Sequence, residues 1–210
     1  MSRKPPLPSK FHAQLGLGGC CCLDFANTVT GRTSTERQDG LASYDDILEW
    51  ASVTGVLEGN ILRKLSAKAK SVPDTASRVH RRARRFRDAI YDVFSAIAAG
   101  DEAARGAMDR LNRETFRILL QTEFRRSTGG YTRQWTAADD ALERILWPVA
   151  WSVFELLNGD EVLLVRECAN PDCYWLFIDR SPNRRRRWCA MRQCGNIMKA
   201  RRHYRRRQKN

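Results

Sequence analysis

Four cysteines near the end of the chain form two pairs with the same internal spacing. Cys168 and Cys173 enclose four residues, Cys189 and Cys194 enclose another four, and 15 residues separate the pairs. Two thiol pairs with a spacer of about 15–20 residues are the usual ligand pattern of a four-thiolate zinc site. Zinc prefers soft ligands at tetrahedral corners, and two short turns that each present two thiolates meet that need. The sequence therefore predicts a bound Zn²⁺.

The predicted zinc is structural rather than catalytic. Four thiolates complete the tetrahedral shell, so no position remains for water or substrate. The segment from Cys168 to the end has only 43 residues and cannot bury enough apolar surface to fold alone, so a metal cross-link can supply the missing folding energy. The aromatic stretch YWLFID after Cys173 is expected to form a strand that packs over the metal.

Basic residues surround the second cysteine pair. We expect the arginine loop before Cys189 to hold phosphates, and a helix after Cys194, folded to about Tyr204, to enter a DNA major groove. On this helix, Ile197, Ala200, Arg201 and Tyr204 are expected on the more covered face. RNA is the alternative polyanion. The predicted DNA contacts are Arg184, Arg185, Arg186, Arg187, Arg192, Lys199, Arg201, Arg202, Arg205 and Arg206.

The positive charge of the chain is concentrated in the same segment. The 210-residue sequence has a formal net charge of +13 and a pI of about 9.9, which favours polyanionic partners. From Cys168 onward, 13 basic residues stand against two acidic ones. We therefore predict a flexible basic arm at 1–12, a helical domain at 13–166 and a zinc-binding module at 167–210.

The sequence gives no sign of a membrane or secreted protein. It has no run of about 18 uncharged apolar residues, as a spanning helix would need, and its basic, proline-rich start does not resemble a signal peptide. We expect a cytoplasmic protein without a membrane partner. In such a reducing compartment the seven cysteines are expected to be thiols or metal ligands rather than disulfides.

The first 166 residues have mainly helical periodicity. Ser43 and Asp46 suit a capping box before a first helix, a second helix is expected over 61–69, and a long third one over 74–99. One face of the third helix carries an arginine cluster, interpreted as a solvated face partly neutralised by nearby acids rather than a nucleic-acid contact. The cluster comprises Arg78, Arg81, Arg82, Arg84, Arg85 and Arg87.

The remainder of this region predicts a fourth helix, a hairpin and a fifth helix. The fourth helix is expected to begin near Asp101, the hairpin to turn at Gly129-Gly130, and the fifth helix to occupy 137–157 with a kink or interruption at Pro148. The predicted fold class is thus α+β: a mostly helical domain with a small antiparallel sheet. It precedes a zinc-finger module made of a hairpin or strand and a basic helix.

The segment GGCCCLDFANTV predicts a short buried strand or a strand-to-helix transition. An extended segment would point Cys21 away from its neighbours, so we interpret Cys20, Cys21 and Cys22 as buried small residues. Asp24 and Asn27 either cap a turn or contact a ligand. The three histidines are scattered and none accompanies a nucleophile, so the sequence predicts no catalytic residue and no enzyme.

Two longer stretches resemble known families. CANPDCYWLFIDRSPNRRRRWCAMRQCGN resembles the CGNR zinc finger, and GGCCCLDFANTV, YDDILEWA and RRFRDAIYDVFSAIAAG resemble the ABATE domain that commonly precedes it. The resemblance implies a stress-linked bacterial transcription regulator, associated with the nucleoid, that binds DNA through the finger. In one departure, Ile197 follows Cys194-Gly195-Asn196 where the family signature has arginine, which removes or relocates one expected positive charge.

We therefore expect a DNA-binding regulator whose N-terminal domain senses a ligand, forms a homodimer or contacts another protein. Two alternatives remain open from the sequence. One is an enzyme that acts on a small molecule near Asp24 and Asn27, with an accessory finger. The other is a zinc-stabilised RNA-binding protein.

Overall fold

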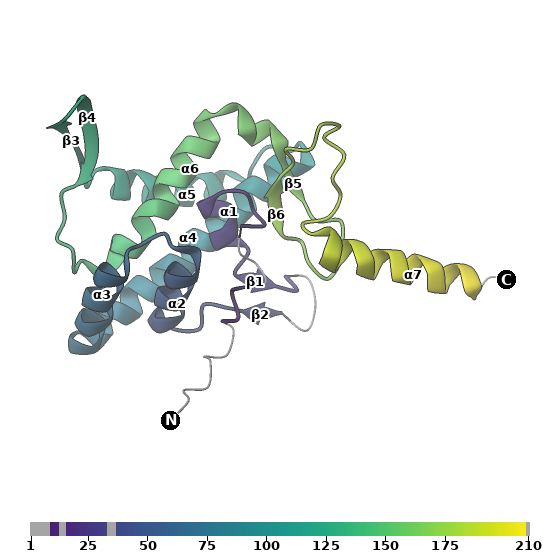
Figure 1. Cartoon of the computed structure of the whole chain (residues 1–210), viewed down its shortest axis with the longest axis horizontal. Helices are drawn as coiled ribbons and strands as arrows, with labels where there is room; N and C mark the ends of the chain where they lie inside the picture. The colour runs from purple at the N-terminus through teal and green to yellow at the C-terminus, as the bar shows by residue number, and fades with distance from the viewer. Residues whose placement is uncertain (1–8, 13–15, 33–36, 209–210) are drawn as a thin grey trace.

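The structure, a computed structural model of the chain, describes residues 9–12, 16–32 and 37–208. Residues 1–8 of the predicted N-terminal arm lie outside these ranges. Within these ranges, six α-helices build the larger part of the molecule and a seventh projects from one end of it (Figure 1). The helices are α1 (Cys21–Ala26), α2 (Tyr44–Thr54), α3 (Gly59–Ser71), α4 (Pro73–Ala99), α5 (Arg105–Leu119), α6 (Trp147–Asn158) and α7 (Asn196–Arg207).

Local signals in the sequence set the ends of the first long helices. Ser43 and Asp46 form the predicted capping box of α2, in which the backbone N–H of Ser43 donates to the Asp46 carboxylate at 2.7 Å. Gly55 ends the same helix in the left-handed conformation, with φ of 68°, which glycine adopts without a steric cost. The predicted second helix is α3, which ends before Pro73.

The long helix α4 is the centre of the domain. It begins at Pro73, where a missing N–H costs nothing, and Gly100 ends it with φ of 82°. Its apolar face, including Phe86 and Phe94, is fully buried, and it packs against α1, α2, α3 and α5. The predicted helix over 74–99 is confirmed, whereas the fourth helix begins at Arg105 instead of near Asp101.

Pro148 interrupts the predicted helix over 137–157. A 3₁₀-helix, η2 (Leu142–Leu146), precedes it, and α6 begins immediately afterwards with Pro148 in its first turn. The interruption follows because proline is tolerated in a first turn but not in a helix interior. The predicted hairpin consists of β3 (Thr122–Ser127) and β4 (Gly130–Trp135), which pair from Thr122↔Trp135 to Ser127↔Gly130.

The described strands form three two-stranded antiparallel sheets where we expected one small sheet. Besides β3 and β4, β1 (Val29–Thr30) pairs with β2 (Gln38–Asp39), and β5 (Val165–Glu167) pairs with β6 (Leu176–Ile178). The 3₁₀-helix η3 (Asp160–Leu164) leads into β5. The α+β class with a mostly helical domain is confirmed.

The segment GGCCCLDFANTV folds in the reverse order from the prediction. The helix α1 comes first and β1 follows it, so Cys21 and Cys22 are helical, while Cys20, directly before the helix, is extended as expected. Gly18 and Gly19 turn the chain into α1, and a Cβ at Gly18 would lie 2.8 Å from the Asp24 nitrogen. Cys22 is fully buried, while Cys20 and Cys21 are half-buried.

Two hydrophobic cores meet at β6. Leu176 and Ile178 belong to the large core beneath α1, α4 and α6, whereas Phe177 points to a small core that contains the four paired cysteines. This alternation follows from the period of two in a strand. In the parts of the chain that the structure describes, no helix has the length and apolarity needed to cross a bilayer.

Candidate metal centre and nucleic-acid interface

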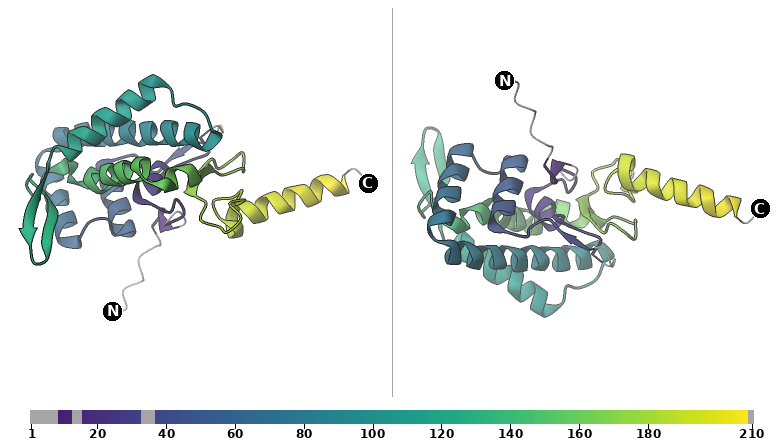
Figure 2. Two further views of the ribbon diagram at one scale, coloured as in Figure 1. Left: turned by 90° about the horizontal axis from the view of Figure 1, so that it is seen from above. Right: turned by 90° about the horizontal axis from the view of Figure 1, so that it is seen from below.

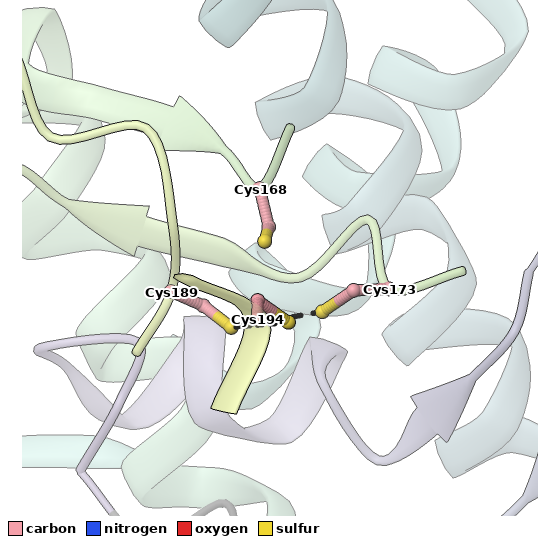
Figure 3. Close-up of side chains that lie close together, drawn as sticks. All are labelled: Cys168, Cys173, Cys189 and Cys194. Carbon is pink, nitrogen blue, oxygen red and sulfur yellow. Dashed lines mark hydrogen bonds between the residues drawn. The ribbon is translucent and has the colours of Figure 1, made fainter. Parts of the chain in front are cut away.

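The four cysteines of the two predicted pairs meet at one point. Their Sγ atoms all lie within 4.8 Å of one another, and all four side chains are buried. Figure 3 shows the side chains pointing toward a common centre. The Sγ atom of Cys189 is 3.6 Å from the Sγ atoms of Cys173 and Cys194. Zinc–sulfur bonds of about 2.3 Å at tetrahedral angles require sulfur–sulfur distances of about 3.8 Å, so the cluster fits zinc.

Each pair of ligands comes from a short turn. Cys168 directly follows β5, and the N–H of Cys173 donates to the Asn170 carbonyl at 2.9 Å, which closes the first turn. The second turn is a π-helix, η4 (Met191–Gly195), in which the Gly195 N–H donates to the Ala190 carbonyl at 3.1 Å. A Cβ at Gly195 would lie 2.3 Å from the Met191 sulfur, so a larger residue in this turn would require the Met191 side chain to move.

The thiols influence one another strongly. A hydrogen bond from Cys173 lowers the pKa of Cys168, and the same contact raises the pKa of Cys173. Four thiolates this close repel one another, so all four can ionise together only around a cation. The amide of Asn170, itself buried, donates to the Cys194 sulfur at 3.3 Å. Such a donor stabilises a thiolate and orients it toward the metal.

The arginine loop is shaped by Asp179. This buried carboxylate accepts hydrogen bonds from the N–H of Ser181 at 3.0 Å and from the N–H of Arg186 at 2.8 Å. Burial alone would raise the pKa of Asp179, but these bonds outweigh it and hold the pKa below its usual value. Arg184 adopts a left-handed conformation in the same loop, with φ of 48°. The loop is therefore a defined turn.

The predicted DNA contacts differ in their surroundings. Arg186 is exposed, but its guanidinium donates to the carbonyls of Trp188 and Cys189 and lies 4.4 Å from the ring centroid of Phe177. Arg201 forms an ion pair with Asp172 at 2.5 Å. The side chains of these two arginines contact other residues of the finger. The other predicted DNA contacts with described side chains are also exposed. The side chain of Arg206 lies outside the description.

The helix α7 stands clear of the rest of the molecule, as Figures 1 and 2 both show. Ile197 is 45% exposed and Tyr204 is 68% exposed, so the covered face predicted for this helix is wrong. Of its described side chains, only Met198 is partly buried. The periodicity correctly predicted a helix, but its apolar positions have no core to pack against, because the small core ends at Cys194.

The finger is bonded to the helical domain through Asn27. Its amide donates to the Leu176 carbonyl at 2.9 Å, and the Leu176 N–H donates back to its side-chain oxygen at 2.8 Å. The indole N–H of Trp175 donates to the Val29 carbonyl at 3.0 Å. Asn27 therefore acts as a backbone-like partner for β6, and the Ile178 N–H of the same strand donates to the Gly18 carbonyl at 3.0 Å. This role was not predicted, because the partner lies 149 residues away in the sequence.

Asp24 has a different environment from Asn27. Its carboxylate accepts from the Gly18 N–H at 2.8 Å, and burial raises the pKa of Asp24 to about 6. It borders a hollow of about 390 Å³ that Cys20, Trp50 and Arg180 also line. Asp24 thus both caps the turn into α1 and faces a space large enough for a small molecule, whereas both polar ends of Asn27 are occupied.

Two residues of the centre were not singled out as site residues from the sequence. Asp179 is one of only two acidic residues after Cys168, and an isolated acid inside a basic segment is a usable signal for a structural carboxylate. Asn170 lies between the first two cysteines, where a side-chain amide commonly forms a turn. Its contact with the Cys194 sulfur depends on the fold of the second turn and has no local signal.

Comparison with protein-family models gives two matches that follow one another along the chain. A model named ABATE, described as "Putative stress-induced transcription regulator", matches residues 19–160. A model described as "CGNR zinc finger" matches residues 165–207, which include all four clustered cysteines. No match was found among curated proteins.

Proposed function

The chain belongs to the ABATE family and carries a CGNR zinc finger, and from this premise we propose that it is a DNA-binding transcriptional regulator. The finger binds DNA, and the helical domain senses a ligand or contacts a protein. The proposal includes a cytoplasmic, nucleoid-associated location in a bacterium. The observation that carries it is α7, a basic helix without a buried side chain among those described.

The dimensions of α7 suit a DNA groove. Its 12 residues correspond to a length of about 18 Å, and the major groove admits one α-helix. Lys199, Arg202 and Arg205 are exposed along it. Because the described side chains of the helix are exposed except for the partly buried Met198, most of its surface is available for a partner, and its apolar side chains Ile197 and Tyr204 can contact thymine methyl groups or sugars.

The arginine loop lies at the base of this helix. Arg184 and Arg185 are exposed and have no ion-pair partner among the described residues, while Arg186 holds the loop to the second cysteine turn. We propose that Arg184 and Arg185 bind phosphates and that Arg186 orients the loop. The zinc keeps loop and helix in a fixed relation, so that both contacts form without further ordering of the chain.

The helical domain has one candidate site for a ligand and one for a protein partner. The hollow beside Asp24 is a candidate ligand site, because the half-buried carboxyl there accepts a hydrogen bond when ionised and donates one when protonated, and burial raises its pKa to about 6. Phe124 and Tyr131 on the hairpin are 76% and 74% exposed, and Leu120 at the end of α5 is 81% exposed. Such exposed apolar side chains suit contact with another protein or a second copy of the chain.

Binding to labelled duplex DNA, measured by fluorescence anisotropy over a range of salt concentrations, tests the proposal. If about five phosphates are neutralised, log K should fall with log salt with a slope of about −4.5. The double variant R202Q/R205Q should weaken binding and reduce the slope by about 2. The control R63Q/R105Q removes the same charge from exposed positions of α3 and α5 and should change neither quantity.

The specificity of binding needs separate measurements. Chromatin immunoprecipitation with sequencing should give discrete promoter peaks, whereas a diffuse background would contradict a regulatory role. Structured RNA that displaces the DNA at matched salt would favour the RNA-binding alternative. Affinity that does not change with salt, or that R63Q/R105Q reduces as much as R202Q/R205Q, would refute α7 as the contact.

A further inference from the structure

A cavity between α4 and α5 is lined largely by arginine. It has a volume of about 500 Å³, and its charged lining consists of five arginines and one acid, Glu143. Thr75 and Val79 complete the lining. The arginines are Arg78, Arg81, Arg82, Arg85 and Arg117. This strong excess of positive charge around one hollow belongs to the helical domain and takes no part in the finger.

The arginines of α4 are crowded along one face of the helix. Positions 78, 81, 82 and 85 are three, four and seven residues apart, so they are neighbours on the helix surface. Like charges at such spacing destabilise a helix by a few tenths of a kcal/mol per pair. The fold therefore retains an unfavourable arrangement of charge at this place.

Three arginines of the same helix, one of them in the cavity lining, are neutralised within the protein. Arg84 and Arg87 form ion pairs with Asp39, and Arg82 pairs with Glu114 at 2.5 Å. Our sequence interpretation of a solvated, partly neutralised face is right about the neutralisation of these three and wrong about the solvation of Arg82 and Arg87, which are buried. Around the cavity the outcome differs: within the described ranges, Arg81, Arg85 and Arg117 have no ion-pair partner.

The arginine cavity is separate from the proposed DNA contact. Arg81 lies in the N-terminal half of α4, and Ser95, which donates to Glu167 beside the first ligand Cys168 at 2.6 Å, lies in the C-terminal half. These positions are 14 residues apart, which corresponds to about 21 Å along the helix. α7 then continues away from the domain (Figure 2). A ligand in the cavity therefore need not meet the DNA.

We infer that this cavity binds a small anion that carries two or more phosphoryl groups. The planar fork of arginine matches phosphate oxygens with paired hydrogen bonds, and a cleft lined by one sign of charge concentrates ions of the other sign. The volume lies within the range of about 300–1,000 Å³ of small-ligand sites. Because the unpaired arginines come from two helices, a ligand with several phosphoryl groups can bridge them, whereas a single phosphate reaches only some.

Calorimetric titration of the full-length, zinc-loaded protein with pyrophosphate at low ionic strength tests this inference. We expect saturable binding with one site per chain, and weaker binding of orthophosphate. The variant R81Q/R85Q changes two exposed side chains and should lower the affinity at least about 10-fold, because each charge-assisted hydrogen bond contributes substantially. E143Q removes the only carboxylate of the lining and should raise the affinity. Thermal unfolding of each variant checks that the domain remains folded.

Two controls separate this site from general attraction to anions. R63Q/R105Q removes equal charge outside the cavity and should leave pyrophosphate binding unchanged. R184Q/R185Q should weaken DNA binding and leave pyrophosphate binding unchanged, so the inference and the proposed DNA contact can fail independently. Titration with ATP and with tripolyphosphate then distinguishes a nucleotide from an inorganic polyphosphate.

Three outcomes would overturn the inference. The first is equal affinity for pyrophosphate in the wild type and R81Q/R85Q. The second is an equal loss in R63Q/R105Q, which would indicate only the overall field of a basic protein. The third is a wild-type protein that does not bind pyrophosphate, combined with a loss of DNA binding in R81Q/R85Q. This result would make the cavity a second nucleic-acid contact.

Discussion

The helical domain and the finger are stabilised in different ways. The domain buries a large set of apolar side chains, including Trp50, Phe86 and Phe94, around α4. The finger has a small core in which Trp175 and Phe177 are the large apolar members beside four cysteines. Because the free energy of apolar burial grows with area, the domain can fold through its own core, whereas the finger depends on metal–sulfur bonds. The spacing of the four cysteines therefore determines the fold of the finger more than its apolar residues do.

The two regions are nevertheless connected through one strand. β6 supplies Leu176 and Ile178 to the large core and Phe177 to the small one, and Asn27 bonds both polar groups of Leu176. A substitution far from β6 should therefore affect either the stability of the helical domain or zinc binding by the finger, but not both. A substitution at β6 should affect both. Three substitutions test this statement.

Replacing Cys173 by serine has the largest expected effect. Structural zinc binds zinc-finger peptides with about 10–16 kcal/mol of apparent free energy at neutral pH, and the loss of one thiolate removes much of it. We expect the variant to lose its zinc, measured by mass spectrometry of the metal, and to become sensitive to protease between residues 168 and 195. The helical content, measured by circular dichroism, should remain close to that of the wild type.

The control for this change is C21S, because Cys21 is half-buried and outside the cluster. It should retain zinc. A C173S protein that is free of metal but still resists protease in the finger would show that the metal does not stabilise this region.

Replacing Asp39 by alanine should produce the next largest effect, within the helical domain. The guanidinium of Arg87 is fully buried and pairs with Asp39. Removing the acid leaves this charge paired only with the more exposed Asp88, at a cost of up to about 3–5 kcal/mol. Urea unfolding should show the loss while the zinc content stays unchanged. D92A, which breaks an exposed pair with Arg110, should cost less than about 1 kcal/mol.

The same ion pair predicts a pH dependence. Burial would raise the pKa of Asp39, but hydrogen bonds from Arg87 outweigh it and hold the pKa below its usual value. A depressed folded-state pKa means that the stabilisation is complete above the unfolded value of about 3.9 and is lost as the pH falls through the folded value. The unfolding free energy of D39A should therefore decrease less in acid than that of the wild type. Equal decreases would contradict this role.

Replacing Asn27 by alanine should have the smallest effect of the three but should reach both regions. It leaves the N–H and carbonyl of Leu176 without their partner, at a cost of about 2 kcal/mol. We expect a lower unfolding midpoint and also a faster release of zinc to a chelator, because β6 lies between the two cores. N158A, which removes an exposed amide bonded to Phe154, should change neither. An unchanged rate of zinc release in N27A would show that the regions are independent.

The sequence predicted those features that depend on nearby residues. The capping box at Ser43, the glycine that ends α4, the hairpin and the interruption at Pro148 all follow from local chemistry. The metal ligands were predictable for a related reason, because zinc coordination imposes the same residue type and spacing on any chain that uses it.

Features that depend on distant partners were not predicted correctly. Cys21 and Cys22 begin a helix, although the composition of the segment favoured a strand, because α1 packs against α4, α6 and β6. The exposed face of α7 looked amphipathic, yet nothing in the fold covers it. Asn27 was singled out for its polarity, but its partner is 149 residues away. In each case the deciding contact is absent from the local sequence.

The division of β6 between two cores has a consequence for how this architecture can change in evolution. A finger transplanted onto another protein would carry Leu176 and Ile178 as exposed apolar side chains, and Trp175 would lose the acceptor on Val29. A one-residue insertion in the strand would exchange its two faces. A transplanted finger should therefore need a matching apolar face and a new acceptor for Trp175, while α7 can vary its contact residues at little cost to the fold.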